Sequence, residues 1–423
     1  MIKFNKNILP NGLRVITVPM KDNPTVTVMV LVEAGSKYET KEINGISHFL
    51  EHMCFKGTDR RPKAIDISKE LDGVGAHYNA FTGQEFTGYY AKSDFRHLDK
   101  ILDVVSDIYL NSTLPESEIE KEKGVIIEEI NMYEDLPQRK VQDVFNGLLY
   151  GDTPAGWDIA GTKENVNSFK RNDLSVYREK HYVAEATSIV VAGNFDEKKI
   201  LPKISNIFSG TRQSRKFGKE KVAEKQENPV VRLSFKETDQ AHFVLGLRTF
   251  DTYDKRNHIL RVLSAILGGG MSSRLFQRIR EEMGAGYYIG ASAEAFTDHG
   301  FFEVAGGVDQ KRMSEVVKAV LEELKKLKME KVSVAELRKT KDYLIGSMYL
   351  NLETSDSLAD FYGYQEIMKK PIKTEDEIVA LVESVSSADV KGVADYIFDS
   401  SKLNLAIIGR YKDQSEFASI LKI

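Results

Sequence analysis

Two histidines one helical turn apart, with a carboxylate between them, are the residues of this sequence best suited to chemistry. His48, Glu51 and His52 lie in the run His-Phe-Leu-Glu-His. On an α-helix, residues i and i+4 project from one face, so both imidazoles can direct a ring nitrogen at one cation. Catalytic zinc takes three protein ligands and a water, so the pair predicts one more ligand elsewhere. Zinc held in this way would acidify the water, and Glu51 would accept its proton.

The third ligand is expected on residues 117–133, a segment of strong helix formers with acids in its first turn. Two acids interrupt an otherwise apolar helical face, which consists of Ile119, Glu122, Ile126, Glu129 and Tyr133. An ionised carboxylate on a buried face is costly unless it is paired or bound to a cation. We therefore predict that Glu129 is the third zinc ligand and that Glu122 orients a histidine. Glu128 shares a polar strip suited to solvent.

The elements that position these residues recur in the second half of the chain. A strand at 25–33, a helix that carries the histidines and a strand at 188–193 are matched by a strand at 241–247, a helix at 258–267 and a strand at 403–409. The matching glycines Gly193 and Gly409 are 216 residues apart. We predict an α+β fold of two homologous domains, residues 1–212 and 229–423, each with a sheet packed against helices. Residues 213–228 are rich in charged and polar residues and are typical of a flexible linker.

The second half also serves as an internal control for the metal site. Its helix at 258–267 has neither the paired histidines nor the carboxylate, and Thr340 and Ser347 stand where the first half has Glu122 and Glu129. The polar residues of the first half are therefore not a requirement of the repeated fold. We expect one Zn²⁺ per chain, bound in the first domain.

Composition narrows the classes of function. The chain has 423 residues, of which 42% are hydrophobic and 29% charged, with a net charge of −4 and a pI near 6.2. This balance gives no general attraction to nucleic acid or to an anionic membrane. The first residues do not form a secretory signal, and no run of 18 apolar residues occurs, so we expect a cytoplasmic protein. The single cysteine, Cys54, is expected to be buried.

The same residues carry a resemblance to a known family. The sequence resembles the pitrilysin/insulysin zinc peptidases, whose motif is the inverted H-x-x-E-H, and within them the short bacterial branch similar to the mitochondrial processing peptidase beta subunit. The similarity runs nearly end to end and is clearest at residues 45–58, 75–80, 87–92 and 122–130. In the family the third ligand is a glutamate 76 to 77 residues beyond the second histidine. Glu129 lies 77 residues beyond His52.

The resemblance implies further site residues and a partner. Each domain would have a mostly antiparallel sheet, and the chain would form half of a clamshell. Arg280 and Tyr287 match a family pair that acts from the opposite half, Tyr287 on the oxyanion and Arg280 on the substrate backbone. A two-domain chain must obtain that half from a second molecule, so a homodimer is expected, with a related, non-identical chain as the alternative. Substrate would add a strand along Ala80, Phe81 and Thr82, with Asn79 supporting the site.

Taken together, the sequence predicts a zinc-dependent endopeptidase that hydrolyses short or unfolded peptides inside a closed dimeric chamber. Two alternatives stay open: a non-catalytic partner subunit, and an enzyme dedicated to processing one precursor. The remaining histidines have no arrangement of a second histidine and glutamates like the one around His48 and His52. We expect them at surface or helix-capping positions; they are His77, His97, His181, His242, His258 and His299.

Overall fold

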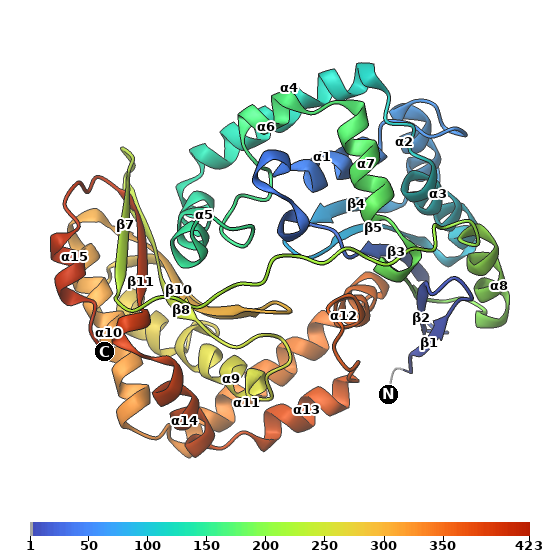
Figure 1. Ribbon diagram of the computed structural model, residues 1–423. Coiled ribbons are helices and arrows are strands. Elements are labelled where there is room, and N and C mark those ends of the chain that lie inside the picture. The colour runs from blue at the N-terminus through green and yellow to red at the C-terminus, as the bar shows by residue number, and fades with distance from the viewer. Residues whose placement is uncertain (1–2) are drawn as a thin grey trace. The chain divides into compact units, whose positions relative to one another are not determined.

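A computed structural model describes residues 3–423 and divides the chain into two compact units, each with its own sheet (Figure 1). Unit 1 comprises Met1–Asn131, Trp157–Glu220 and Tyr349–Glu375. Unit 2 comprises Met132–Gly156, Lys221–Met348 and Asp376–Ile423. The expected α+β class, with sheets packed against helices, is confirmed.

The sheet of unit 1 has six strands in the order β1-β2-β6-β3-β5-β4. They are β1 (Asn5–Ile8), β2 (Arg14–Pro19), β3 (Thr25–Val32), β4 (His77–Thr82), β5 (Thr87–Asp94) and β6 (Thr187–Gly193). Neighbours are antiparallel except β2 and β6, which run parallel. The strand β4 lies at one edge, so within residues 3–423 one of its sides has no partner strand.

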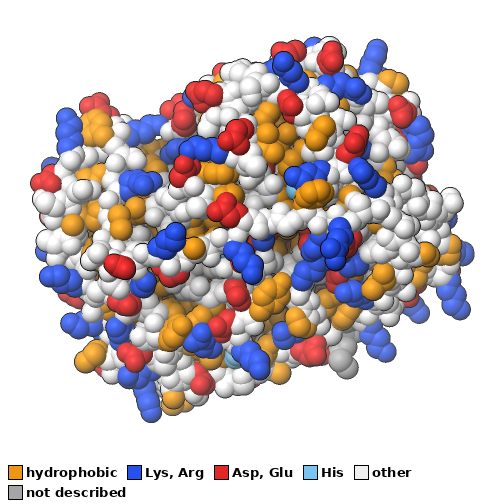
Figure 2. Space-filling view, in the orientation of Figure 1, with side chains coloured by type: hydrophobic (Ala, Val, Ile, Leu, Met, Phe, Trp, Pro, Cys, Tyr) orange, Lys and Arg blue, Asp and Glu red, His pale blue; other side chains and the backbone are white. Residues whose placement is uncertain are grey.

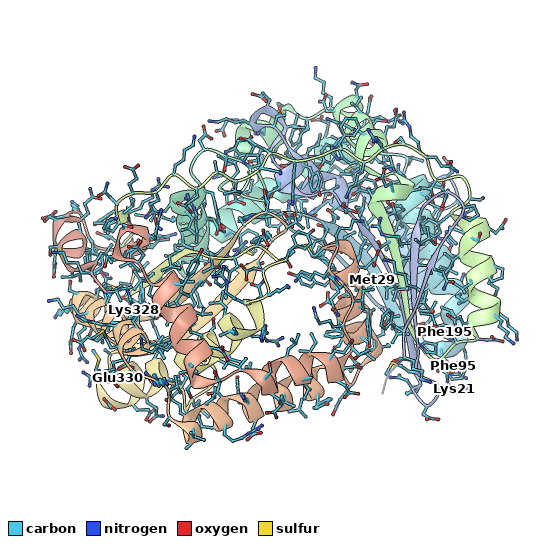
Figure 3. All side chains as sticks on the ribbon, turned by 60° about the horizontal axis from the view of Figure 1, so that its bottom comes forward. Lys21, Met29, Phe95, Phe195, Lys328 and Glu330 are labelled. Carbon is cyan, nitrogen blue, oxygen red and sulfur yellow. The ribbon has the colours of Figure 1, made fainter. Side chains whose placement is uncertain are left out.

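Helices cover both faces of the central strand β3, which explains why all its residues after Thr25 are buried. Its even-numbered valines share a core with α3 (Leu98–Asn111). Met29 and Leu31 face α12 (Ser355–Ile367) instead, and Figure 3 labels Met29 beside that helix. Gly363 permits this approach, because a Cβ there would lie 2.8 Å from Leu31 Cδ1. The other helices of unit 1 are α1 (Ile46–Cys54), α2 (Ala64–Asp72), α4 (Glu116–Asp135), α6 (Lys163–Ser168), α7 (Arg171–His181) and α8 (Glu197–Ile207). The last four residues of α4, from Met132, are assigned to unit 2.

The sheet of unit 2 repeats this strand order without a counterpart of β1. Its order is β7-β11-β8-β10-β9, and β7 and β11 form the parallel pair. The strands are β7 (Val230–Phe235), β8 (Gln240–Arg248), β9 (Gly286–Ala295), β10 (Gly300–Asp309) and β11 (Asn404–Gly409). The helices are α5 (Pro137–Tyr150), α9 (Asn257–Gly268), α10 (Met313–Met329), α11 (Val334–Asn351), α13 (Glu375–Ser384), α14 (Ser387–Ile397) and α15 (Ser415–Ile420), with a π-helical segment η5 (Phe276–Glu282). The last three residues of α11 and the first residue of α13 are assigned to unit 1. The matched order agrees with an internal duplication.

Each half of the sequence gives one helix to the other half's sheet. The helix α5 comes from the first half and packs against β7, β8 and β11 of unit 2. The helix α12 comes from the second half and packs against β2, β3 and β6 of unit 1. The packing units are therefore not the contiguous halves drawn at residues 212 and 229.

The segment 213–228 has neither helix nor strand, in line with a linker, but its side chains are held in place. Lys216 pairs with the buried Glu33, and the ring of Phe217 lies against His181. Beyond the unit boundary at residues 220 and 221, the Val222 N–H donates to Asp298. The first part of the segment therefore contacts unit 1, and the part after residue 220 contacts unit 2.

The surface carries charges of both signs. On the face shown in Figure 2, basic and acidic side chains are interspersed, consistent with the small net charge. Within residues 3–423, no helix is long and apolar enough to cross a membrane.

The expectation that the other histidines are surface or capping residues is wrong for three of them. His181, His242 and His299 are buried, at 3%, 9% and 5% exposure. Each lies among aromatic rings, His181 against Tyr177 and His242 beside Tyr288. Burial lowers the pKa of His181 to about 4, so this ring packs as a neutral aromatic side chain. Residue type alone does not reveal that packing role.

Candidate metal centre

The helix that carries the two histidines is anchored at its start by a buried carboxylate. Both oxygens of Glu39 accept backbone N–H groups at the start of α1, those of Gly45 and Ser47, each at 2.8 Å. A negative charge is favourable at this end of a helix. Gly45 has φ 99°, and a Cβ there would lie 2.6 Å from the carbonyl oxygen of Ala160, so glycine is required. These contacts fix where α1 begins.

The structure brings together the three residues expected to bind zinc. His48 Nε2 lies 3.2 Å from His52 Nε2, and Glu129 Oε2 lies 3.6 Å from the first nitrogen and 3.5 Å from the second. Two zinc ligands at about 2.0 to 2.1 Å in tetrahedral geometry are separated by roughly 3.4 Å. The three distances therefore match the separations that one zinc ion requires of its ligands.

The chemistry of these atoms is also suited to a cation. His52 Nδ1 lies 2.8 Å from Glu122 Oε1, and donation to that carboxylate places the ring proton on Nδ1. The lone pair of His52 Nε2 is then directed at His48 Nε2 and at a carboxylate oxygen of Glu129. When His48 also carries its proton on Nδ1, three acceptors face one another, and they repel unless a proton or a metal ion lies among them. The residues present thus fit a zinc ion.

The pKa values of the two histidines are shifted in opposite directions. Burial and the neighbouring His52 lower the pKa of His48 to about 4, so this imidazole is neutral at pH 7. For His52 burial acts in the same direction, but the hydrogen bond to Glu122 and the negative charges of Glu51 and Glu129 outweigh it and raise the pKa. Glu122 also pairs with Lys56 at 2.6 Å. Despite burial, its contacts with His52 and Lys56 lower the pKa of Glu122, so it stays ionised.

The helix α4 presents Glu129 as the sequence pattern predicts. Ile119, Glu122 and Ile126 are buried on one face, and Glu129 continues that face with its side chain 23% exposed. Glu128 is exposed and accepts a hydrogen bond from Asn131. The helical spacing therefore separates the carboxylate at the metal centre from its neighbour in solvent.

Glu51 lies in the same turn of α1 and contacts the end of strand β4. The Thr82 hydroxyl donates to Glu51 Oε2 at 2.5 Å, within the range of a charge-assisted hydrogen bond. Burial raises the pKa of Glu51, and the Thr82 hydroxyl opposes that shift. A carboxylate with a raised pKa suits proton transfer near neutral pH.

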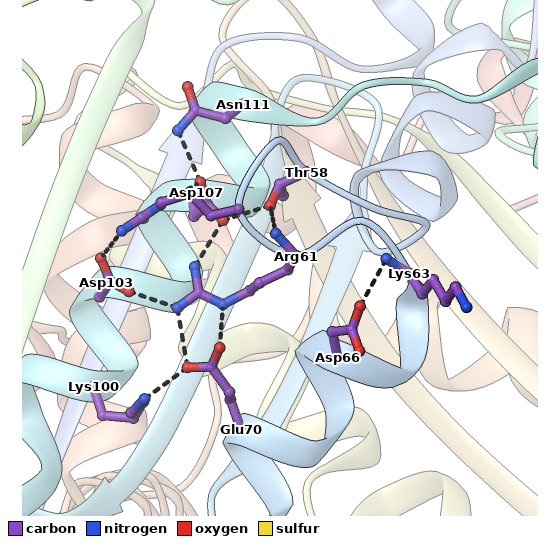
Figure 4. Close-up of polar contacts among 10 residues, drawn as sticks. Thr58, Arg61, Lys63, Asp66, Glu70, Lys100, Asp103, Asp107 and Asn111 are labelled. Carbon is purple, nitrogen blue, oxygen red and sulfur yellow. Dashed lines mark hydrogen bonds and ion pairs between the residues drawn. The ribbon is translucent and has the colours of Figure 1, made fainter.

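An arginine-centred ion network holds the loop that follows α1 (Figure 4). The buried guanidinium of Arg61 contacts Glu70 of α2 and both Asp103 and Asp107 of α3, at 2.5 to 2.9 Å. Thr58 adds a hydrogen bond to Asp107 at 2.6 Å. The loop is thereby tied to the two helices beside it, and α2 leads directly into β4.

The strand expected to bind substrate has an open edge. Ala80 packs toward the core, and Phe81 lies against Phe86 on the opposite face. Thr82 points to Glu51, the residue expected to act as the base. Asn79 is exposed, and its side-chain oxygen accepts the N–H of Ala80 at 2.9 Å instead of contacting a histidine.

The Arg280 and Tyr287 pair lies in unit 2. The Arg280 guanidinium stacks over the Phe276 ring, 4.9 Å from its centroid, and Nη1 donates to the Tyr287 carbonyl oxygen at 3.2 Å. The Tyr287 side chain is 59% exposed. The backbone bond fixes the spacing of the pair and leaves the phenol free to reach a ligand.

Sequence reasoning did not find the Glu39 cap, the Lys56 contact or the Thr82 contact with Glu51. Glu39 and Lys56 act from loops whose path no periodicity reveals. The inward direction of Thr82 could have been predicted, because Tyr78, Ala80 and Thr82 lie at alternate positions of β4 and so share one face of the strand. A threonine at the end of that inward face is suited to a polar partner.

Comparisons with known proteins are consistent along the whole chain. The sequence model described as Insulinase (Peptidase family M16) matches residues 14–163, and the one described as Peptidase M16 inactive domain matches residues 168–344. An uncharacterized zinc protease of Bacillus subtilis, YmxG, is 37% identical over 92% of this chain and 94% of its own length. An uncharacterized zinc protease of Streptomyces coelicolor is 33% identical over 97% of this chain and 90% of its own length.

Solved structures share the fold. A protease from Helicobacter pylori superposes with a TM-score of 0.90 at 23% identity, covering 96% of this chain and all of that one. A structure described as a peptidase M16 inactive domain, from Pseudomonas fluorescens, also has a TM-score of 0.90, at 16% identity, covering 98% of this chain and all of that one. At these identities the likeness establishes the fold alone.

Proposed function

This chain belongs to the insulinase family, peptidase family M16, and from that membership we propose that it is a zinc-dependent peptidase with its catalytic centre in unit 1. The observation that carries the proposal is the convergence of His48 Nε2, His52 Nε2 and Glu129 Oε2 within 3.6 Å of one another. The curated relatives are described as zinc proteases, which agrees with this donor set.

Each residue of the centre has its own role in the proposed hydrolysis of a peptide bond. Zinc, when bound, supplies a Lewis acid that makes water nucleophilic at neutral pH. Glu51 accepts the proton of the attacking water on its carboxylate and returns it to the leaving nitrogen of the peptide bond. Glu122 holds His52 with its ring nitrogen directed at the metal position. The buried surroundings of Glu51 favour the protonated form that the second step requires.

Substrates are proposed to be short or unfolded peptides cleaved internally. An extended peptide can add a strand to the unpaired edge of β4. Backbone hydrogen bonds would then provide the affinity, and these depend little on the amino-acid sequence of the substrate. Folded proteins do not offer such a free strand. This edge supports an endopeptidase of broad specificity.

The active assembly is proposed to be a homodimer that forms a closed chamber. In it, Arg280 and Tyr287 of one copy act on substrate bound at the zinc centre of the other, Tyr287 stabilising the oxyanion. The exposed phenol of Tyr287 is compatible with this role.

The proposal is tested by incubating the purified protein with a mixed pool of unstructured peptides, with and without a chelator, after its zinc content has been measured. Broad cleavage that stops with chelator and returns with zinc supports the proposal. Cleavage of a single peptide at one site indicates a dedicated processing enzyme, and a zinc-free, inactive protein indicates a non-catalytic subunit. Glu51→Gln should keep zinc and lose about 10²-fold or more in kcat, with the exposed Glu128→Gln as control.

A further inference from the structure

We propose that Thr82 is a positioning residue that fixes the orientation of the Glu51 carboxylate; this inference rests on the proposed function. Its hydroxyl donates to Glu51 Oε2 at 2.5 Å, while α1 and β4 meet in the same core. One carboxylate oxygen is thereby occupied, and Oε1 retains its lone pairs for proton transfer.

The base needs such a constraint because of its neighbours. A glutamate side chain has three rotatable bonds, and carboxylate oxygens are themselves good zinc ligands. An unrestrained Glu51, in the same helical turn as His48 and His52, can rotate to coordinate the ion and cease to act as a base. A charge-assisted hydrogen bond from Thr82 opposes that rotation.

Thr82 is itself held by a rigid frame. It is the last residue of β4 and pairs with Thr87 across the hairpin, whose turn is closed by the Gly83 N–H donating to the Phe86 carbonyl at 2.9 Å. As a β-branched residue on a strand, it has few side-chain rotamers. The hydroxyl direction therefore follows from the backbone of the hairpin.

A second segment braces this turn from outside. The Ser36 N–H donates to the Gly83 carbonyl at 3.3 Å and the Lys37 N–H to the Gln84 carbonyl at 2.9 Å. A Cβ at Gly35 would lie 2.3 Å from the Gly83 carbonyl oxygen, so only glycine allows the approach.

Buried charges complete the brace. Glu85, at the turn, is buried and lies 3.8 Å from the ammonium of the buried Lys37. Lys219, just before the boundary between the units, also pairs with Glu85. The hairpin end that carries Thr82 is thus fixed by backbone and ionic contacts together.

The test compares Thr82→Val, which keeps the shape and removes the hydroxyl, with Thr82→Ser, which keeps the hydroxyl. Thr27→Val is the control, because Thr27 is also a strand threonine whose hydroxyl has a side-chain hydrogen-bond partner, Ser355 at 2.9 Å, away from Glu51. Zinc content, kcat, KM and a crystal structure are obtained for each variant, with Thr82→Ala in reserve should Thr82→Val not fold.

We expect Thr82→Val to lose about tenfold or more in kcat with KM within about twofold and zinc content unchanged. Thr82→Ser should recover most of the loss, Thr27→Val should equal the wild type, and the Glu51 carboxylate should be rotated in the crystal of Thr82→Val. Wild-type kcat in Thr82→Val, or an unmoved Glu51, overturns the inference. A wild-type protein without peptidase activity instead overturns the proposed function, and the orientation of Glu51 in the crystals still decides the role of Thr82.

Discussion

His52 Nδ1 and Glu122 Oε1 lie 2.8 Å apart, and this contact fixes which nitrogen of the ring is available to a metal. Glu122 is buried at 3% exposure and is also paired with Lys56, so it acts as an immobile acceptor. The contact crosses between two helices, α1 and α4, that are separated by 61 residues of chain. It links the two elements that supply the proposed zinc ligands.

Glu122→Gln should weaken zinc binding about 10- to 100-fold, because an amide is a poorer acceptor for the His52 ring proton. The zinc dissociation constant, measured by competition with a chromophoric chelator, checks this. Glu120→Gln on the exposed side of α4 is the control and should bind zinc as the wild type does. Equal affinity in both variants would show that Glu122 does not orient the ligand.

Arg61→Leu should lower the free energy of unfolding by about 3 to 5 kcal/mol, since it removes the buried guanidinium that pairs with Glu70, Asp103 and the buried Asp107. The neighbouring Arg60 also contacts Asp103 and Asp107 but is 55% exposed, so Arg60→Leu should cost about 1 kcal/mol or less. Urea unfolding of the two variants provides the comparison. Similar losses would mean that the buried network contributes little to holding the loop after α1.

Acidification should stabilise the protein through Glu303 of β10. Burial raises the pKa of Glu303 to about 7 from 4.5. Between pH 4.5 and 7 the folded state therefore binds this proton and the unfolded state does not, so the contribution to stability falls as the pH rises. Glu303→Gln should be more stable than the wild type at pH 8, by on the order of 3 kcal/mol, and nearly equal to it below pH 4.5.

Unfolding of both proteins at pH 4, 6 and 8 gives the measurement. The difference between them isolates Glu303 from the other titrating groups. A difference that stays constant with pH, or that grows on acidification, would contradict the assignment.

Glu51→Gln and Tyr287→Phe should each be inactive alone and should regain activity when mixed under conditions that exchange subunits. In a homodimer with shared sites, the mixed dimer contains one intact site, so about a quarter of wild-type activity is expected. The rate of peptide cleavage after mixing reports this directly. No recovery, in a mixture shown to have exchanged subunits, would place both residues in the same site of one chain.

Periodicity and duplication were sufficient to predict much of the fold and the approach of His48, His52 and Glu129 to one another. The alternating valines of β3, the acids on one face of α4 and the histidine pair on α1 all follow local rules that leave a pattern in sequence. The matched strand orders of the two sheets agree with the duplication seen between Gly193 and Gly409.

Features that depend on long-range packing left no such pattern. Nothing in residues 137–150 or 355–367 indicates that α5 and α12 pack on the sheet of the other half, because both faces of each sheet require an apolar helix. The contacts of Glu39 with α1 and of Lys56 with Glu122 come from irregular loops, where spacing does not fix direction. The buried His181 packs as a neutral ring, which its residue type does not reveal.

The central claim is that His48, His52 and Glu129 hold one zinc ion. Anomalous diffraction at the zinc edge, from crystals of the wild type, Glu129→Gln and Glu128→Gln, tests it most directly. We expect one zinc peak about 2.0 to 2.2 Å from His48 Nε2, His52 Nε2 and a Glu129 oxygen in the wild type. The peak should persist in Glu128→Gln and be weak or absent in Glu129→Gln. A zinc peak at other residues, or full occupancy in Glu129→Gln, would show that these three residues are not the zinc ligands.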